Sequence, residues 1–328
     1  MIYTLRHLTA YRYRRPVRFA RCSMRLRPRD GEGQIVLESR VTISPEPRTR
    51  TVRRDAFGIE TVSITLDAPH TEFRVEALSR VDVARPPLPE PESGPSWEAV
   101  RAAALAERSL GPDAPAHFLF PSARVPLVPA VTEYARASFP PGRSAYGGAV
   151  ELMHRIGADF RFDAKATTVS TPLAESFALR AGVCQDFAHI MIAGLRGLGL
   201  PAAYMGGYLR TTPPPGRPRL RGADASHAWV ALWCDGVWHG LDPTNGVGVR
   251  DHHIVVARGR DYGDVSPIDG IVTASGPQKL RVEVDVVPED EPMPEEGPVP
   301  QGAEQGVEQG AEHEAEHEAG IAEEAFVA

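Results

Sequence analysis

The most informative segment for the fold is Gly182-Val-Cys-Gln-Asp-Phe-Ala-His-Ile-Met-Ile-Ala-Gly-Leu-Arg-Gly-Leu-Gly-Leu-Pro201. Its apolar residues recur every three or four positions from Cys184 to Leu198, which predicts a mostly buried helix. Gly199 and Pro201 then form a stop signal for that helix. Cys184 is therefore expected in the first turn of a buried helix.

The position of Cys184 favours a reactive thiol. A thiol attacks as the thiolate, and the unpaired N–H groups and dipole at a helix N-terminus stabilise that negative charge. Asp186 in the same turn is expected to interact with the helix dipole rather than to catalyse. The other two cysteines, Cys22 and Cys234, form no C-x-x-C pair with any residue, so neither a disulfide scaffold nor a structural zinc site is expected.

A hairpin further along the chain supplies two partners for this thiol. Residues 228–233 and 237–242 have the pattern of two strands, and Asp235-Gly236 between them is a strong two-residue turn. This turn pairs Cys234 with Val237 and thereby fixes the register of the whole hairpin.

In that register His227 and Asp242 are diagonal neighbours on one face of the hairpin. Diagonal neighbours have Cα atoms ~7–8 Å apart, within reach of an imidazole–carboxylate hydrogen bond. Trp229 lies opposite Asp242 on the same face, where it would shield that bond from water. The other face is apolar and is expected to pack on the core; its residues are Val230, Leu232, Val237 and Leu241.

These residue types predict a Cys–His–Asp acyl-transfer site. His227 would take the proton of Cys184, and Asp242 would hold the imidazole tautomer. The thiolate would attack an amide or ester carbonyl, and water or a second amine would resolve the thioester. The backbone N–H of Cys184 would bind the oxyanion, with Gln185 as a weak candidate for the second donor.

Periodicity divides the chain into four parts. Residues 1–84 alternate between apolar and polar with period two, which predicts an all-β domain, a small sandwich. Residues 85–95 form a proline-rich linker. Residues 96–287 form the core, with helices expected after Ser96, around 131–138 and around 149–156. Residues 288–328 are rich in Pro, Glu and Gly and are expected to be a disordered acidic tail.

The charge pattern argues against a nucleic-acid-binding protein. The net charge is −7, but thirteen acidic residues and no Lys or Arg lie after Pro288. Nine arginines lie in the first thirty residues, where they alternate with apolar residues as on the solvated face of strands. No apolar run approaches the ~20 residues of a membrane helix, and no export signal is recognisable, so a cytoplasmic protein without membrane contact is expected.

Several separated blocks resemble the bacterial transglutaminase-like family, whose core belongs to the papain-like thiol enzymes. The core blocks come in the family's order, and the first domain resembles the family's N-terminal β domain. The resemblance covers roughly residues 1–287. The blocks are Gly182-Val-Cys-Gln-Asp-Phe-Ala-His189, Gly199-Leu-Pro201, Asp224-Ala-Ser-His-Ala-Trp229, Gly240-Leu-Asp-Pro-Thr-Asn245, Gly259-Arg-Asp-Tyr-Gly-Asp-Val265, His7-Leu-Thr-Ala-Tyr-Arg-Tyr-Arg-Arg-Pro-Val17 and Leu26-Arg-Pro-Arg29.

The resemblance implies an α+β fold in which the helix bearing the nucleophile packs on an antiparallel sheet. It assigns the family's functional residues to Cys184, His227 and Asp242, and it implies that Tyr262 and Asp264 line the substrate cleft. The sequence departs from the family at three positions: Ile59 replaces a usual Asn, and Ala203 and Gly206 stand where Arg and Ser are common. The departures at Ala203 and Gly206 are expected to affect the substrate cleft, and the proline-rich loop 211–222 is expected to border it.

Three functions remain open at this point. The leading prediction is a cysteine protease or amidase acting on a peptide or protein substrate. The second is a transglutaminase that passes the same thioester to an amine, and the third is a non-catalytic binding protein. No cofactor is expected, no acidic loop of the calcium-binding kind is present, and the oligomeric state is not predicted. His189 is expected to be a packing or surface residue, and two histidine pairs suggest a metal only weakly: His252-His253, and His313 with His317.

Overall fold

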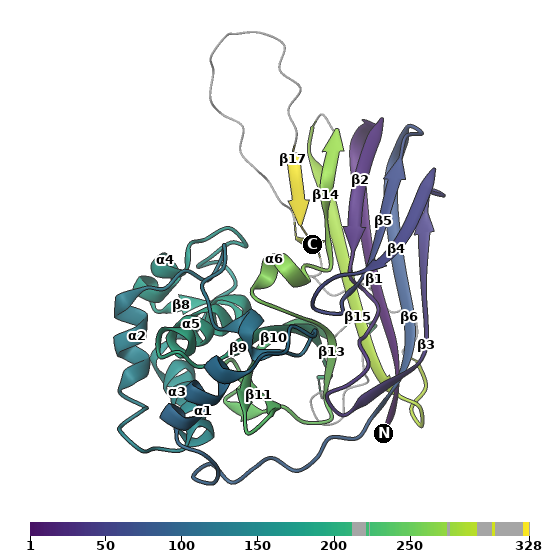
Figure 1. Cartoon of the computed structure of the whole chain (residues 1–328). Helices are drawn as coiled ribbons and strands as arrows, with labels where there is room; N and C mark the ends of the chain where they lie inside the picture. The colour runs from purple at the N-terminus through teal and green to yellow at the C-terminus, as the bar shows by residue number, and fades with distance from the viewer. Residues whose placement is uncertain (212–220, 223, 274–275, 294–303, 306–323, 328) are drawn as a thin grey trace, which may run out of the picture.

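The computed structural model describes residues 1–211, 221–222, 224–273, 276–293, 304–305 and 324–327 of the 328-residue chain (Figure 1). The fold is α+β, as expected: two β sheets stand beside a core of helices and a third sheet. The loop residues 212–220 and the pair His313 and His317 lie outside the described residues.

The two sheets beside the core form the β domain. Their strand orders are β16-β15-β1-β6-β3 and β17-β14-β2-β5-β4, and every pair is antiparallel. The strands are β1 (Ile2–Val17), β2 (Phe19–Met24), β3 (Gln34–Ser44), β4 (Thr49–Arg54), β5 (Glu60–Leu66), β6 (His70–Val83), β14 (Ile268–Thr273), β15 (Gln278–Pro288), β16 (Glu304–Gln305) and β17 (Glu324–Val327).

Alternating burial makes these two sheets a sandwich. Along β6 the side chains of Phe73 and Val75 are fully buried, while their neighbours face outward. They share one apolar cluster with Cys22 and Met24 of β2 and with Ile64 of β5. The period-two pattern therefore encoded the inward face of each sheet, and the predicted sandwich is confirmed.

The β domain does not end at residue 84, so the predicted domain boundaries are wrong at the C-terminal side. β15 pairs with β1 from Tyr3↔Pro288 to Tyr13↔Gln278, and β14 pairs with β2. Residues 268–288 were expected in the core. The physical reason is that β1 has two hydrogen-bonding edges, of which β6 covers only one, and an uncovered edge attracts a further strand.

The described part of the tail also differs from the expected disorder. Glu304–Gln305 forms β16 on the edge of β15, and Glu324–Val327 forms β17 on the edge of β14. Both segments complete an otherwise open sheet edge with backbone hydrogen bonds, which a prediction from composition does not consider. Residues 294–303 and 306–323 lie outside the described residues.

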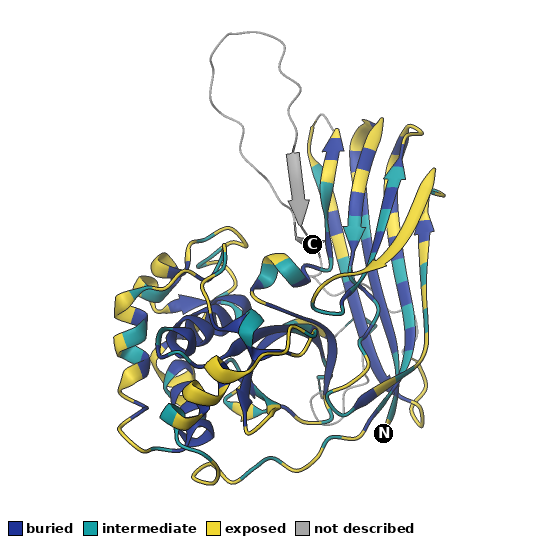
Figure 2. Cartoon of the chain, viewed as in Figure 1, coloured by how far each residue is buried: buried dark blue, intermediate teal, exposed yellow. Residues whose placement is uncertain are grey.

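The core packs helices against a curved five-stranded sheet of order β12-β11-β10-β9-β13. Helix α5 contacts β9 and β10 on one side and α2 on the other. Figure 2 shows α5 and the strands beneath it as the buried centre of the core, with exposed residues on the outer helices. The helices are α1 (Trp97–Ala106), η1 (Pro115–Phe118), α2 (Pro129–Arg136), α3 (Ala145–Asp159), α4 (Leu173–Leu179), α5 (Cys184–Gly197) and α6 (Tyr262–Val265). The strands are β7 (Arg161–Phe162), β8 (Ala181–Gly182), β9 (Ala202–Leu209), β10 (Ala225–Cys234), β11 (Val237–Asp242), β12 (Val247–Gly248) and β13 (His253–Gly259).

The helix signals in the sequence are confirmed. Ser96 caps α1 by accepting a hydrogen bond from the backbone N–H of Ala99 at 3.3 Å. Gly199 follows the end of α5 with φ +81°, the left-handed conformation that ends a helix without a Cβ clash. The predicted stripe of α3 is buried; it consists of Ala149, Leu152, Met153 and Ile156.

Candidate active site

Cys184 is the first residue of α5, as the sequence predicted. Val183 before it is extended, and its N–H donates to the carboxylate of Asp186 at 2.8 Å. The hydroxyl of Thr167 donates to the same carboxylate oxygen at 2.6 Å. Asp186 therefore caps the helix that begins at Cys184, which supports the structural role expected for it.

Among the three cysteines, Cys184 has the environment of a reactive thiol. Its residue is partly exposed, whereas Cys22 and Cys234 are buried. Burial raises the pKa of the Cys22 thiol to about 12 and that of Cys234 to about 11. Those two thiols stay protonated near neutral pH and are inert in substitution chemistry.

The hairpin of β10 and β11 has the predicted register. Cys234 pairs with Val237 and Val230 with Leu241. Asp235 and Gly236 have φ values of 53° and 79°, as a two-residue turn of this type requires. The apolar face is buried except at Val237, which is 53% exposed because it follows the turn at the tip of the hairpin.

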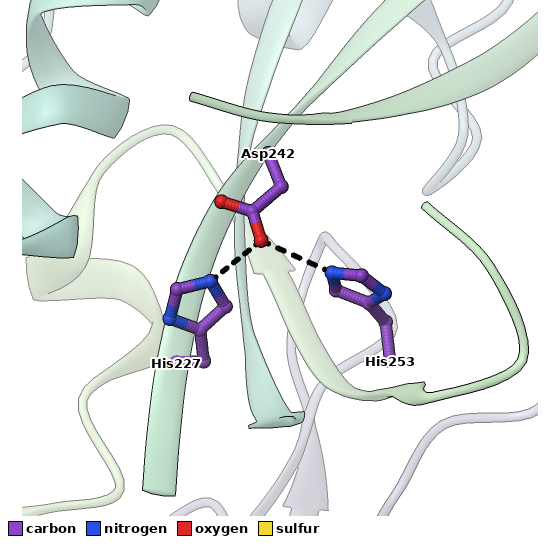
Figure 3. A group of neighbouring side chains, drawn as sticks. All are labelled: His227, Asp242 and His253. Atoms are coloured by element: carbon purple, nitrogen blue, oxygen red, sulfur yellow. Dashed lines mark hydrogen bonds and ion pairs between the residues drawn. The ribbon is translucent and has the colours of Figure 1, made fainter. Parts of the chain in front are cut away.

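His227 and Asp242 make the predicted hydrogen bond across this hairpin. Nε2 of His227 lies 2.8 Å from Oδ2 of Asp242 (Figure 3). The same imidazole also interacts with Cys184. Burial alone lowers the pKa of His227, but the hydrogen bonds and charges of Asp242 and Cys184 outweigh burial and raise it to about 10. The imidazole is thus held as an imidazolium beside the sulfur.

Asp242 is fully buried and its carboxylate is saturated with donors. Oδ2 accepts from Nδ2 of Asn245 at 2.7 Å, and Oδ1 accepts from the backbone N–H groups of Thr244 and Asn245 at 3.0 and 3.2 Å. Burial acts to raise the pKa of Asp242, but the hydrogen bonds from His227 and His253 outweigh burial and lower it. The carboxylate therefore stays ionised inside the protein.

Comparisons with known proteins agree with this geometry. A family model described as the bacterial transglutaminase-like N-terminal region matches residues 3–82, and one described as the transglutaminase-like superfamily matches residues 133–243. An uncharacterized protein of Mycobacterium tuberculosis is 41% identical over 295 residues, which cover 87% of this chain and 92% of that protein. The chain belongs to the transglutaminase-like superfamily.

Two further relatives of this transglutaminase-like protein extend the comparison. An uncharacterized protein of Mycobacterium leprae is 31% identical over 287 residues, covering 85% of this chain and 96% of that protein. A solved structure from Cytophaga hutchinsonii, named provisionally as a cysteine protease, shares the fold with a TM-score of 0.67 at 19% identity. It covers 90% of this chain and 94% of its own, so both domains of the transglutaminase-like protein are represented in it.

His253 was not predicted at the site, yet its Nε2 lies 3.1 Å from the same Oδ2 of Asp242 (Figure 3). The sequence offered only the adjacent pair His252-His253, which was weighed as a weak metal signal. Pairing of β13 with β9 brings His253 to the hairpin, and this pairing joins segments more than forty residues apart. The sequence therefore showed the histidine, but it did not show the pairing of β13 with β9 that places the histidine beside Asp242.

Trp229 lies where the hairpin register predicted it. Its side chain is buried, with the ring centroid 6.1 Å from that of His227. The same ring meets His253 edge-on at 5.3 Å. The indole therefore packs against both histidines that bind Asp242, consistent with the shielding expected for it.

Three further residues, Gln185, Asp264 and Tyr262, were predicted near the thiol. The side-chain amide of Gln185 donates to the carbonyl of Val169 at 3.2 Å, so it is already engaged. Asp264 binds the guanidinium of Arg260 at 2.8 and 2.9 Å, so its carboxylate is engaged in an ion pair, and its place in the substrate cleft stays a prediction. Tyr262 is half-buried, and the charge of Cys184 contributes to raising its pKa, after the larger effect of burial.

His189 packs inside the core, one of the two roles expected for it. It is buried, its ring lies 5.0 Å from that of Tyr204, and its Nε2 accepts from the backbone N–H of Tyr262 at 3.2 Å. Burial lowers the pKa of His189 to about 3, so it is a neutral acceptor. His189 thereby holds the start of α6 beside the first turns of α5.

Proposed function

We propose that this transglutaminase-like protein is a thiol-dependent acyl-transfer enzyme that hydrolyses amide bonds in peptides or proteins through Cys184, His227 and Asp242. One observation carries the proposal: His227 hydrogen-bonds through Nε2 to a fully buried, ionised Asp242, and its imidazole also interacts with Cys184, a partly exposed cysteine at a helix N-terminus. A catalytic triad consists of a nucleophile that contacts a base and a carboxylate that orients the base.

The proposed reaction begins with the Cys184 thiolate and the His227 imidazolium. The sulfur attacks the amide carbonyl, and the backbone N–H of Cys184 at the start of α5 stabilises the oxyanion. His227 then gives its proton to the leaving amine as the C–N bond breaks, which leaves a thioester on Cys184. Neutral His227 next takes a proton from water, the hydroxide attacks the thioester, and the acid product leaves with the thiolate restored. Asp242 stays ionised throughout.

Hydrolysis is favoured as the outcome because the Cytophaga hutchinsonii protein that shares both domains is named provisionally as a cysteine protease. A transamidation would use the same thioester with an amine in place of water. The triad residues do not differ between the two reactions, so the test below separates them.

The test is intact-mass measurement of a glutamine-rich protein such as casein after incubation with wild type or Cys184→Ala, with and without a primary amine. Cleavage or deamidation that requires Cys184 supports hydrolysis. An amine-dependent gain of mass that requires Cys184 means transamidation and overturns the hydrolase proposal. Equal results for wild type and Cys184→Ala across a panel of peptide and protein amides would overturn acyl transfer and leave a binding role.

A further inference from the structure

The carboxylate of Asp242 serves two histidines, and the triad uses only one of them. Nε2 of His227 lies 2.8 Å and Nε2 of His253 lies 3.1 Å from the same oxygen, Oδ2 (Figure 3). The side chains of His253 and Asp242 are 4% and 0% exposed. A buried imidazole in this place requires a reason, because burying a polar ring is costly unless its nitrogens are hydrogen-bonded.

The tautomer of His253 follows from its second hydrogen bond. The backbone N–H of Arg250 donates to Nδ1 of His253 at 3.4 Å. Nδ1 is therefore an acceptor, so the proton of the neutral ring is on Nε2 and points at Asp242. Burial lowers the pKa of His253, which keeps the ring neutral. His253 therefore donates a hydrogen bond to Oδ2 and does not act as a second base.

The same three side chains could also offer ligands to a metal ion, since their ligand atoms all lie within 4.8 Å of one another. A metal at Nε2 of His253 would move the ring proton to Nδ1, directly against the N–H of Arg250. A metal at Nε2 of His227 would displace the proton that joins His227 to Asp242. The hydrogen-bonding role therefore fits the surroundings better than metal binding does.

The backbone of His253 is held independently of its ring. Nη2 of Arg85 donates to the carbonyl of His253 at 2.7 Å, and Nε of Arg85 donates to the carbonyl of Arg250 at 3.2 Å. The N–H of His253 donates to the carbonyl of Arg250 at 3.0 Å, which closes the turn before β13. The ring is thus presented to Asp242 from a turn tied to the segment that joins the two domains.

We propose that His253 is a positioning residue for the triad, whose neutral Nε2–H fixes Oδ2 of Asp242 in the place from which it orients His227. The proposal rests on the proposed function only in that Cys184 is taken as the nucleophile. His227 and Asn245 also donate to Oδ2, but His227 changes its charge during the reaction and Asn245 lies in the turn that follows β11. His253 is the donor on a paired strand, so it keeps the carboxylate in place while His227 changes its charge.

The experiment compares His253→Gln with His253→Phe in the full chain. Gln places an amide N–H near the position of Nε2, whereas Phe keeps the ring against Trp229 and removes the donor. The readout is the rate of alkylation of Cys184 by iodoacetamide from pH 5 to 11, followed by intact mass. This readout needs no substrate, so a failure of the proposed amide hydrolysis would not affect it. Buried Cys22 and Cys234 are the internal controls.

We expect wild type and His253→Gln to share one pH profile of alkylation. His253→Phe should lose about tenfold of the alkylation rate near neutral pH, the effect of one lost hydrogen bond of about 1.4 kcal/mol. Loss in His253→Gln with a wild-type profile in His253→Phe would mean that the ring acts by packing alone and would overturn the proposal, as would equal loss in both variants. A rise of melting temperature with Zn²⁺ that requires His253 would also overturn it, in favour of a metal site.

Discussion

At the scale of single residues, the pair of Cys184 and His227 sets the pH range of the chemistry. The hydrogen bonds and charges of Asp242 and Cys184 outweigh burial and raise the pKa of His227 to about 10. The imidazolium therefore persists through neutral pH and is lost only near pH 10. We expect the amide-cleaving rate to stay level from about pH 6.5 to 9 and to fall as pH approaches 10. A pH series of kcat/KM checks this, and a fall centred on the ordinary histidine value of about 6.5 would contradict it.

The same shift has a consequence for stability. The folded pKa of His227, about 10, lies above the ordinary value of about 6.5, so its contribution is fully present below pH 6.5. That contribution is lost as pH rises toward about 10. We expect the melting temperature of wild type to fall more steeply between pH 7 and 10 than that of His227→Gln, which has no titrating group there. Parallel curves for the two proteins would show that the imidazolium is not stabilised in the folded state.

At the scale of elements, the first turn of α5 depends on its acidic cap. Asp186 accepts the N–H of Val183 and the hydroxyl of Thr167. Asp186→Ala removes both acceptors, and we expect it to lower the free energy of unfolding by about 1 kcal/mol or more. Asp186→Asn keeps one acceptor oxygen and should lose less. Urea denaturation of the three proteins checks the order; a difference of less than a few tenths between Ala and wild type would contradict the capping role.

The pairing of β9 with its two neighbours depends on a glycine. Gly207 pairs with His227 on β10 and with Val255 on β13. A Cβ at Gly207 would lie 2.0 Å from the carbonyl oxygen of Ile254 and 2.7 Å from the ring of Trp229. Gly207→Ala must therefore push apart the strands that carry His227 and His253.

Gly206→Ala is the matched control, because a Cβ there would lie 3.2 Å from the nearest side-chain carbon, in Val265. We expect Gly207→Ala to lower the melting temperature by several degrees and to slow alkylation of Cys184, while Gly206→Ala changes both far less. Equal effects at the two positions would show that close approach of β13 is not required.

At the scale of the whole molecule, a strand from the C-terminal part of the chain, β15, pairs with the first strand, β1. β15 pairs with β1 along eleven positions, and the N–H of Glu289 donates to the carbonyl of Ile2 at 3.0 Å. Gln34 links the β domain to the core: its Nε2 donates to the carbonyl of Val255 at 2.8 Å, and its Oε1 accepts from the N–H of Val255 at 2.9 Å. The β domain therefore supports β13, the strand that begins with His253.

Two truncations test this pairing. A chain ending at Met293 keeps β15, and we expect its melting temperature and Cys184 reactivity to stay close to those of the full chain. A chain ending at Pro277 loses β15 and exposes one edge of β1, so we expect it to be insoluble or to unfold well below the full chain. Thermal unfolding followed by circular dichroism distinguishes the two. A large loss in the chain ending at Met293 would show that β16 and β17 stabilise the fold.

Every helix among the described residues is too short or too polar to span a lipid bilayer. The cytoplasmic location stays a prediction.

Features that depend on neighbouring residues could be predicted from the amino-acid sequence. Helical spacing after Gly182 placed Cys184 at the start of α5, and the Asp235-Gly236 turn placed His227 beside Asp242 by counting along two strands. Such features are encoded locally, because turn type and side-chain period leave one register for each segment.

Which distant segments share a sheet edge or a hydrogen bond became clear only from the folded molecule. It placed β14 and β15 in the β domain, and it brought His253 to the carboxylate of Asp242 through the pairing of β13 with β9. The alternation of β15 suits either domain equally, and a histidine at the start of a strand has no partner until the neighbouring strand is known. Strand pairing over long separations is selected by the total burial and backbone hydrogen bonding of the folded molecule, which no local pattern contains.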